Sequence, residues 1–358
     1  MTKSLKNPHP VYIATYITTL FLIFEPFLLM NMHKLISDFP QNIVDALKIA
    51  SETGFRQPEN EIHNIVICGM GGSGIGGKLV AQWVQRELPV PVLFFQDYDL
   101  PAYVGKNSLV IGSSYSGNTE ETLTSVKQAL ERGAHIIGVC SGGELADFCQ
   151  SNKLDFVVVP GGNPPRSAVA FSVVQIVNIL EKLGFIPGDS LKEVEKGRQL
   201  IVQENEAIHS EAKKLAHFLK DKVIAIYSAS KYEAVAVRAR QQFNENGKLL
   251  CWHHVIPEMN HNELVGWGGG DNRFGALFLD TEDLIPRNQK RLEFSLEVIR
   301  SKTENVYILK TKGDTVIQRS IYLINLVDWA SWYLSELKGV DAMDIRVIDS
   351  LKDTLSKF

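Results

Sequence analysis

Cysteine is scarce in this sequence, and the common metal-binding motifs are missing. Four cysteines occur among 358 residues, with no CxxC pair and no HxH or HExxH motif. This pattern argues against a disulfide framework and provides no zinc ligand set. Cys68 and Cys140 end apolar runs that are typical of strands. We therefore predict buried thiols in a reducing compartment, namely the cytoplasm, and a site that binds no metal.

Blocks of like charge and low-complexity segments are missing as well. The formal net charge is −4, and residues of both signs are spread along the chain. The sequence therefore indicates neither a nucleic-acid partner nor a disordered acidic tail. Hydrophobic residues make up 45% and charged residues 22%, which is typical of a globular protein, and the length allows two domains.

The one long apolar run lies near the N-terminus. Residues 11–30 read VYIATYITTLFLIFEPFLLM, which is compatible with a signal peptide or a membrane anchor. Glu25 and Pro26 interrupt this run, and no small-x-small cleavage site follows before Met32. Two other interpretations remain open: translation begins at Met30 or Met32, or the segment forms a packed N-terminal helix. No membrane partner is expected, because an ordinary start of a soluble domain follows.

From residue 64 onward, short apolar runs alternate with segments of helical periodicity. Strands are expected at NIVICGM, PVLFFQ, SLVIGSS, HIIGVC and DFVVVP, and then at KVIAIYSA, LLCWHHV, FGALFLD and ENVYILK. Such alternation predicts an α/β protein with parallel sheets flanked by helices, in a doubly wound, flavodoxin-like arrangement. We predict an extension over residues 1–31, a first domain over 32–190, a helical connector over 191–221, and a second domain with a C-terminal helix over 222–358.

A glycine-rich loop, GMGGSGIGG, joins the first expected strand to a helix that begins near Ser73. Glycines let the backbone approach an anion, and the helix N-terminus supplies free N–H groups. The loop contains GxGxxG as Gly69, Gly71 and Gly74, and Asp97 lies near the end of the next strand. By itself it therefore also fits a nicotinamide-dependent enzyme, or a tight turn that binds nothing.

A second loop, SSYSGNTEET, carries three hydroxyl groups beside a helix start, on Ser114, Ser116 and Thr119. Hydroxyls and backbone N–H groups suit a phosphate monoester that has to enter and leave. The alternative is a capping box, with Asn118 as N-cap and Glu121 three residues later. Because both loops follow strands of one parallel sheet, we expect them to converge on a single crevice.

The motifs taken together resemble a known family. GGSG followed by SYSGNT is similar to the sugar isomerase (SIS) domain. GGNPPRSA with Arg166, RQQFNENGK with Glu245, PEMNHNELVG with His261, and a C-terminal helix with Lys352 resemble the bifunctional phosphoglucose/phosphomannose isomerase family in its form with two SIS domains. The resemblance covers about residues 32–358. The N-terminal extension departs from the family, which favours the later translation start.

The resemblance implies an aldose–ketose isomerase without a cofactor or metal. It would interconvert glucose 6-phosphate, mannose 6-phosphate or both with fructose 6-phosphate through an enediolate. Glu245 would transfer the proton between C1 and C2, and Arg166 would stabilise the enediolate. His261 would open the sugar ring, and Lys352 would lie near the ring oxygen. The residues expected to bind the phosphate group are Gly72, Ser73, Ser114, Ser116 and Thr119.

Each assignment has an ordinary structural alternative. Without the resemblance, Glu245 reads as a solvated carboxylate at a helix end and Lys352 as an exposed helical lysine. His261 reads as a surface histidine, which is also our interpretation of His253 and His254.

The resemblance also implies a homodimer in which His261 serves the site of the neighbouring subunit. The alternative function is a non-catalytic SIS-domain regulator that binds a sugar phosphate. The joint presence of Glu245 and His261 argues against it. The ratio of glucose to mannose activity stays open, because Ile345 stands about two helical turns before Lys352, where a hydroxyl would assist rotation about C2–C3.

Overall fold

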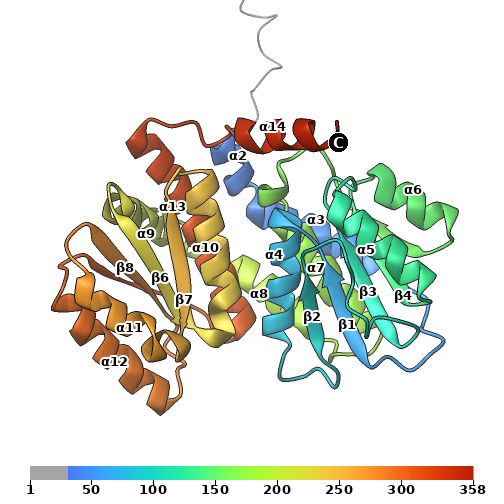
Figure 1. Ribbon diagram of the computed structural model, residues 1–358, viewed down its shortest axis with the longest axis horizontal. Coiled ribbons are helices and arrows are strands. Elements are labelled where there is room, and N and C mark those ends of the chain that lie inside the picture. The colour runs from blue at the N-terminus through green and yellow to red at the C-terminus, as the bar shows by residue number, and fades with distance from the viewer. Residues whose placement is uncertain (1–30, 358) are drawn as a thin grey trace, which may run out of the picture.

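The computed structural model describes residues 31–357, which fold into two α/β halves (Figure 1). The three interpretations of the apolar run at residues 11–30 lie outside the described residues. Within the described part, no helix combines the length and the apolar character that a membrane crossing requires.

The first half contains a five-stranded parallel sheet. Its strands are β1 (Asn64–Cys68), β2 (Val92–Phe95), β3 (Ser108–Ser113), β4 (His135–Cys140) and β5 (Asp155–Val158), in the spatial order β2-β1-β3-β4-β5. The central strands are buried almost throughout, which is typical of a sheet covered on both faces. The strand order reverses between β1 and β3, so the loops after these two strands leave a crevice at the carboxyl edge.

Helices cover both faces of this sheet. They are α3 (Phe39–Glu52), α4 (Gly71–Trp83), α5 (Glu120–Glu131), α6 (Gly143–Ser151) and α7 (Val169–Lys182). The short helix α2 (Met32–Ser37) precedes them and contacts α3 and the second half instead. Apolar residues of α4 and α7 pack on one face, and those of α5 and α6 pack on the other. The predicted doubly wound α/β arrangement is therefore confirmed for the first half.

The second half contains a four-stranded parallel sheet. Its strands are β6 (Val223–Ala229), β7 (Cys251–Ile256), β8 (Phe274–Asp280) and β9 (Val306–Lys310), in the order β7-β6-β8-β9. The helices are α10 (Glu233–Glu245), α11 (Glu263–Gly266), α12 (Pro286–Arg300), α13 (Val316–Lys338) and α14 (Arg346–Leu355). α10 and α13 lie on the inner face, toward the first half, whereas α11 and α12 lie on the outer face (Figure 1).

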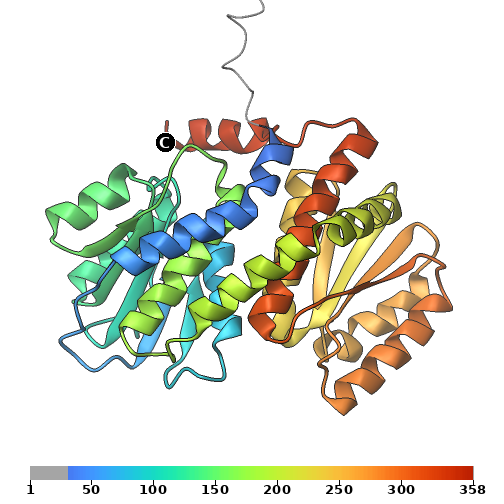
Figure 2. The same cartoon turned by 180° about the vertical axis from the view of Figure 1, so that it is seen from behind.

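The stretch expected to connect the halves forms two helices of the core. α8 (Ser190–Gln203) and α9 (Asn205–Leu219) pack against α13, and α8 also contacts α3 and α7 of the first half (Figure 2). One hydrophobic cluster therefore runs from Ile65 of β1 through Val194 of α8 to Leu323 of α13. This shared core joins the two sheets into one body and fixes the surfaces that face each other.

The segment around His261 differs from the polar loop that the sequence predicts. It forms three short helical pieces: η3 (Glu258–His261), α11 and η4 (Trp267–Gly269). Met259 and Trp267 anchor the segment, because both side chains are buried in the outer core of the second half. Two apolar residues in a polar sequence are enough to fold it onto the sheet.

Candidate active site

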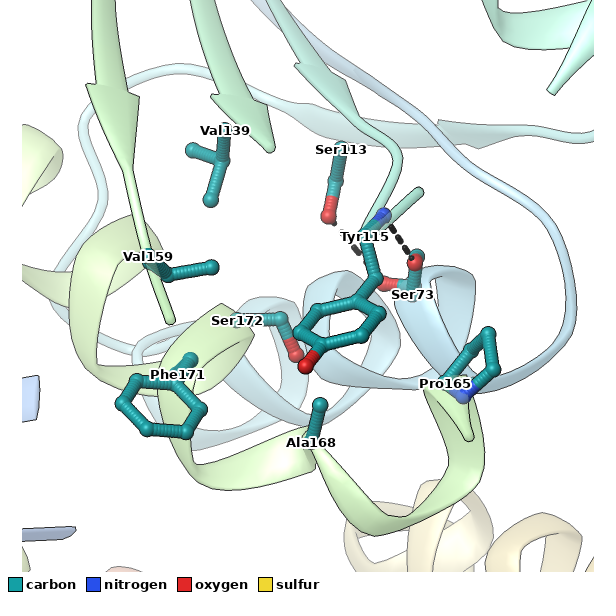
Figure 3. A pocket seen from close by; sticks show the side chains of 10 residues that line it. Ser73, Ser113, Tyr115, Val139, Val159, Pro165, Ala168, Phe171 and Ser172 are labelled. Carbon is teal, nitrogen blue, oxygen red and sulfur yellow. Dashed lines mark hydrogen bonds between the residues drawn. The ribbon is translucent and has the colours of Figure 1, made fainter. Parts of the chain in front are cut away.

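The two loops that the sequence singles out lie side by side at the carboxyl edge of the first sheet. The glycine-rich loop leads from β1 into α4, and the hydroxyl-rich loop leads from β3 into α5. The amide of Tyr115 donates to Ser73 Oγ at 2.8 Å, and Ser113 Oγ donates to the Ser73 carbonyl oxygen at 3.3 Å (Figure 3). The expected convergence on one crevice is therefore present.

The three hydroxyl groups of the second loop surround the start of α5. Ser114 Oγ donates to Thr119 Oγ1 at 2.8 Å, and the Thr119 side chain is half-buried while that of Ser116 is exposed. The capping box does not form: the N-cap is Thr119, and no side chain caps the helix among the described residues. Asn118 Oδ1 instead accepts from the Glu144 amide at 3.0 Å. The first N–H groups of α5 thus remain available to an anion.

Gly72 and Ser73 have a packing role in addition to any contact with phosphate. A Cβ atom on Gly72 would lie 2.6 Å from the Pro165 carbonyl oxygen and 2.7 Å from the Arg166 amide nitrogen. Only a glycine therefore lets the Arg166 loop approach the start of α4 this closely. Below this contact lies a cavity of about 10 Å³, which Tyr115 also lines (Figure 3). It has room for about one water molecule, so it is no substrate site.

A charged pair connects the two halves. Arg166 lies on η1 (Pro165–Ser167), after the last strand of the first sheet, and Glu245 is the last residue of α10 in the second half. Arg166 Nη1 lies 3.5 Å from Glu245 Oε2, with the arginine side chain 4% exposed and the glutamate 29% exposed. Two residues that are 79 positions apart thus meet with the carboxylate still open to solvent.

Buried polar groups hold the Arg166 guanidinium and backbone in place. Arg166 donates from Nε to Asn246 Oδ1 and from Nη2 to the Ala342 carbonyl oxygen, both at 2.9 Å. Arg238 on α10 donates from Nη2 to the Arg166 carbonyl oxygen at 2.6 Å. Arg238 in turn pairs with Asp328 of α13 at 2.7 Å, and both side chains are buried. Only Nη1 of Arg166 is left facing Glu245.

None of the residues that support Arg166 was predicted from the sequence. Arg238 falls within the stretch EAVAVRARQQF, and an arginine that shares a helix face with Ala234 and Val235 is the signal that could have found it. Asn246 is part of the NENGK motif and is fully buried, where its Nδ2 donates to Ser331 Oγ at 2.9 Å.

The electrostatics of the pair follow from its burial. Burial lowers the pKa of the Arg166 guanidinium, and the neighbouring Glu245 carboxylate opposes that effect. Arginine stays protonated even so, because its ordinary pKa is far above neutrality. Lys248 adds a second cation, and its Nζ donates to the Glu245 and Asp344 carbonyl oxygens. The pKa of Lys248 is lowered mainly by burial and to a smaller extent by the positive charge of the nearby Arg166.

His261 lies far from this pair within the same chain. Glu245 ends α10 just before β7, whereas His261 follows the end of β7 on η3. The two side chains therefore lie at opposite edges of the second sheet, separated by roughly 20 Å, the length of a strand of six residues at ~3.3 Å per residue. His261 is exposed, and its ring forms no hydrogen bond within the described residues. One chain alone does not assemble all the predicted catalytic residues.

Lys352 is likewise not brought into contact with Arg166 or Glu245. It lies on α14, its side chain is 70% exposed, and its Nζ is 4.0 Å from Asp349 Oδ1. The chain that leads into α14 does reach the site, because Ala342 accepts the hydrogen bond from Arg166. α14 itself begins at Arg346, four residues after Ala342.

The two remaining histidines of interest are not free surface side chains. His253 and His254 lie on β7 and are 19% and 25% exposed. His253 Nε2 lies 3.6 Å from Glu233, and His254 Nδ1 lies 2.6 Å from Glu263. The interpretation of both as ordinary surface histidines is therefore wrong. All four cysteines are buried and unpaired, as predicted.

Two family models and several known proteins are similar in sequence to this chain. The model for the bacterial phospho-glucose isomerase C-terminal SIS domain matches residues 208–355, and the SIS domain model matches residues 60–161. The bifunctional phosphoglucose/phosphomannose isomerase of Caldicellulosiruptor bescii is 34% identical over 91% of this chain and 99% of its own.

Two further similarities are informative. The D-glucosamine-6-phosphate 4-epimerase of Sulfolobus acidocaldarius is 33% identical over 81% of this chain and 88% of its own. Among solved structures, the C-terminal domain of glucosamine-fructose-6-phosphate aminotransferase from Francisella tularensis superimposes with a TM-score of 0.70 at 14% identity, covering 88% of this chain and 99% of that domain. The structural similarity supports the fold of two SIS domains.

Proposed function

The chain belongs to the bifunctional phosphoglucose/phosphomannose isomerase family, and we propose that Glu245 carries out its proton transfer. The protein is a sugar-phosphate aldose–ketose isomerase, and its proposed substrates are glucose 6-phosphate, mannose 6-phosphate or both, interconverted with fructose 6-phosphate. The observation that carries the assignment of Glu245 is its pairing with the buried Arg166 across the two halves, next to the loops of the first sheet.

The proposed chemistry requires a base near C1 and C2 and a cation near the developing oxyanion. Glu245 is half-buried and reachable from solvent, so it can take a proton from one carbon and return it to the other. The guanidinium of Arg166 is fixed by hydrogen bonds before substrate arrives, and it can stabilise the enediolate oxygen without reorganising. Lys248 adds positive potential to the same region.

We assign phosphate binding to the start of α5 and the hydroxyl groups around it. Ser116 and Thr119 are the accessible donors, while Ser114 holds Thr119 in position and Ser73 ties the two loops together. Neutral donors and uncapped N–H groups bind the dianion without a strong ion pair, which favours release of product. The contact of Gly72 with the Arg166 loop keeps the phosphate end and the reacting end of the sugar at a fixed spacing.

The proposal includes a homodimer in which His261 of a second copy opens the sugar ring. The separation of roughly 20 Å between His261 and Glu245 in one chain supports this, since a strand of six residues lies between them. A two-fold dimer would supply both sites equally. Lys352 would act near the ring oxygen of the site formed by its own chain, and we propose a cytoplasmic location for the enzyme.

Replacement of Glu245 by glutamine tests the assignment. Glu245→Gln keeps the size of the side chain but removes the base, so kcat should fall by roughly 10²–10⁴-fold with little change in affinity. Coupled assays with glucose 6-phosphate and mannose 6-phosphate measure both activities. Glu131→Gln, which likewise changes the last glutamate of a helix but at an exposed position away from Arg166, is the matched control and should remain fully active. Near-normal turnover by Glu245→Gln would assign the proton transfer to another group.

The similarity to a 4-epimerase indicates a second reaction to test, the epimerisation of a sugar phosphate at C4. Product analysis by NMR after incubation with glucosamine 6-phosphate detects C4 epimerisation directly. A non-catalytic regulator, in contrast, would bind sugar phosphates and gain thermal stability from them but turn over none.

A further inference from the structure

The last described helix is amphipathic, and no other part of residues 31–357 covers it. α14 has no buried residue. Its apolar residues Val347, Ile348, Leu351 and Leu355 are 87%, 41%, 58% and 48% exposed and follow helical spacing along one side. A helix of ten residues is marginal in water unless its apolar face is packed. A surface outside the described part of this chain therefore has to cover this stripe.

A second uncovered surface lies beside His261. A hollow of about 680 Å³ is lined by residues of η3, α11 and α12, and Asn260, the neighbour of His261, is among them. Val265, Ile285 and Phe294 at or near this hollow are 81%, 57% and 59% exposed. Like the stripe on α14, this α11–α12 surface exposes large apolar side chains without a partner in the described chain.

The two surfaces carry opposite net charge. Residues 285–294 contain Arg287, Lys290 and Arg291 against Glu293, which gives a net charge of +2. Residues 341–355 contain four aspartates against Arg346 and Lys352, which gives a net charge of −2. Arg287 and Arg291 form no ion pair with any described residue, so they are available to an acidic partner.

We propose that α14 of one protomer packs on the α11–α12 surface of a second copy, and that the two-fold symmetry of the dimer repeats this contact. The proposal deepens the proposed function, because the shared site already brings His261 of the second copy to the Glu245 site. The α11–α12 surface adjoins His261, and α14 continues from Ala342, which contacts Arg166. A dimer that places His261 of the second copy at the Glu245 site therefore brings the two uncovered surfaces together.

This contact also gives Lys352 a defined position. Lys352 follows Ile348 by four residues and so lies at the border of the apolar stripe. Once the stripe is packed on the second copy, the helix that carries Lys352 is ordered beside the shared site. The dimer interface then supplies His261 from one chain and orients Lys352 on the other.

Substitutions on the apolar stripe test the contact, because loss of the dimer lowers the mass of the protein in solution. Leu351→Asp should raise the dimer dissociation constant at least about 30-fold, the size of effect expected for a buried apolar contact. Phe294→Asp should do the same from the other surface, and for both the specific activity should fall on dilution. Ser350→Asp changes the adjacent exposed residue off the stripe and should leave the dimer intact. Sedimentation velocity measures the mass, and circular dichroism checks the fold.

A cross-link tests the same contact without weakening it. Leu351→Cys combined with Phe294→Cys should form a covalent dimer on mild oxidation, since the four native cysteines are buried, whereas either cysteine alone should not. Absence of the covalent dimer, with both aspartate variants still dimeric, overturns the proposal. If removal of residues 1–30 alone makes the stripe susceptible to modification, the occupant is the N-terminal segment instead. The mass and cross-linking readouts do not depend on activity, so an active Glu245→Gln enzyme would refute the proposed chemistry and leave this interface standing.

Discussion

A buried arginine is a useful catalytic cation only when its donors point at the substrate before the reaction begins. Four of its neighbours fix Arg166: Asn246 and Ala342 accept from the guanidinium, Arg238 donates to its carbonyl oxygen, and Glu245 faces the remaining nitrogen. Asn246 links the guanidinium to Ser331 of α13. At the scale of single residues, the site is therefore preorganised from one side and open on the side of Glu245.

Asn246 should position Arg166 without touching the substrate. Asn246→Ala removes the acceptor for Arg166 Nε, and a displacement of the guanidinium by about 1 Å can lower kcat by up to about 10²-fold. We expect KM to change much less, because the phosphate loops are untouched. Steady-state kinetics with both substrates measure the two effects separately.

Asn246→Asp keeps the acceptor and should recover part of the lost kcat. Asn152→Ala, at the exposed end of α6, is the control and should behave like the unchanged enzyme. A lower melting temperature with unchanged kcat would make Asn246 a purely structural residue.

At the scale of elements, the site depends on how closely α4 and η1 approach. Gly72 on the first turn of α4 lies against the backbone of Pro165 and Arg166, which holds the start of α4 and the Arg166 loop together as one unit. Gly74 makes a similar approach to Gly69 within the same turn. The glycine-rich sequence therefore has a packing reason besides the binding of an anion.

Gly72→Ala should damage both stability and catalysis. The added Cβ would lie 2.6 Å from the Pro165 carbonyl oxygen, so the Arg166 loop has to shift. We expect a loss of about 1–3 kcal/mol in the free energy of unfolding, with a lower kcat. Gly54→Ala places its Cβ in open space and should stay within about 0.5 kcal/mol of the parent. Urea denaturation and steady-state assays measure both, and equal behaviour of the two variants would contradict this role of Gly72.

At the scale of the whole molecule, the carboxyl edge of one sheet lies next to the amino edge of the other. The carboxyl edge of the first sheet, with Arg166, faces the amino edge of the second, where α10 ends at Glu245. The carboxyl edge of the second sheet, with η3 and His261, points away from this site (Figure 1). Within one chain, Arg166 and Glu245 thus meet near the amino edge of the second sheet, whereas His261 lies at its carboxyl edge.

Mixing two inactive variants tests the shared site. Glu245→Gln and His261→Ala chains that exchange at random give half mixed dimers, and each mixed dimer has one site with both defects and one with neither. Activity should therefore recover to about a quarter of the unchanged enzyme. Mass measurement confirms that the subunits have exchanged. Mixtures that exchange but stay inactive would place both residues in one chain.

The strands and the candidate site residues could be predicted without the structure. Apolar runs separated by helical periods specify parallel strands because both faces of such a sheet are buried, and all nine strands predicted from residue 64 onward are present. The loops after β1 and β3 were identified from local features alone, since glycines and hydroxyls beside a helix start have a meaning that depends only on neighbouring residues. Glu245 and Arg166 were identified through family motifs, which are also local.

Which of these residues meet could be learned from the three-dimensional structure alone. No pattern along the chain reports that Arg166 contacts Glu245, that Arg238 and Asp328 form a buried pair behind them, or that His261 lies at the opposite edge. Those relations depend on the packing of α8, α9 and α13 between the sheets, which fixes the angle of one half against the other. Local sequence sets the dihedral angles of an element, but long-range burial of apolar surface sets where that element lies.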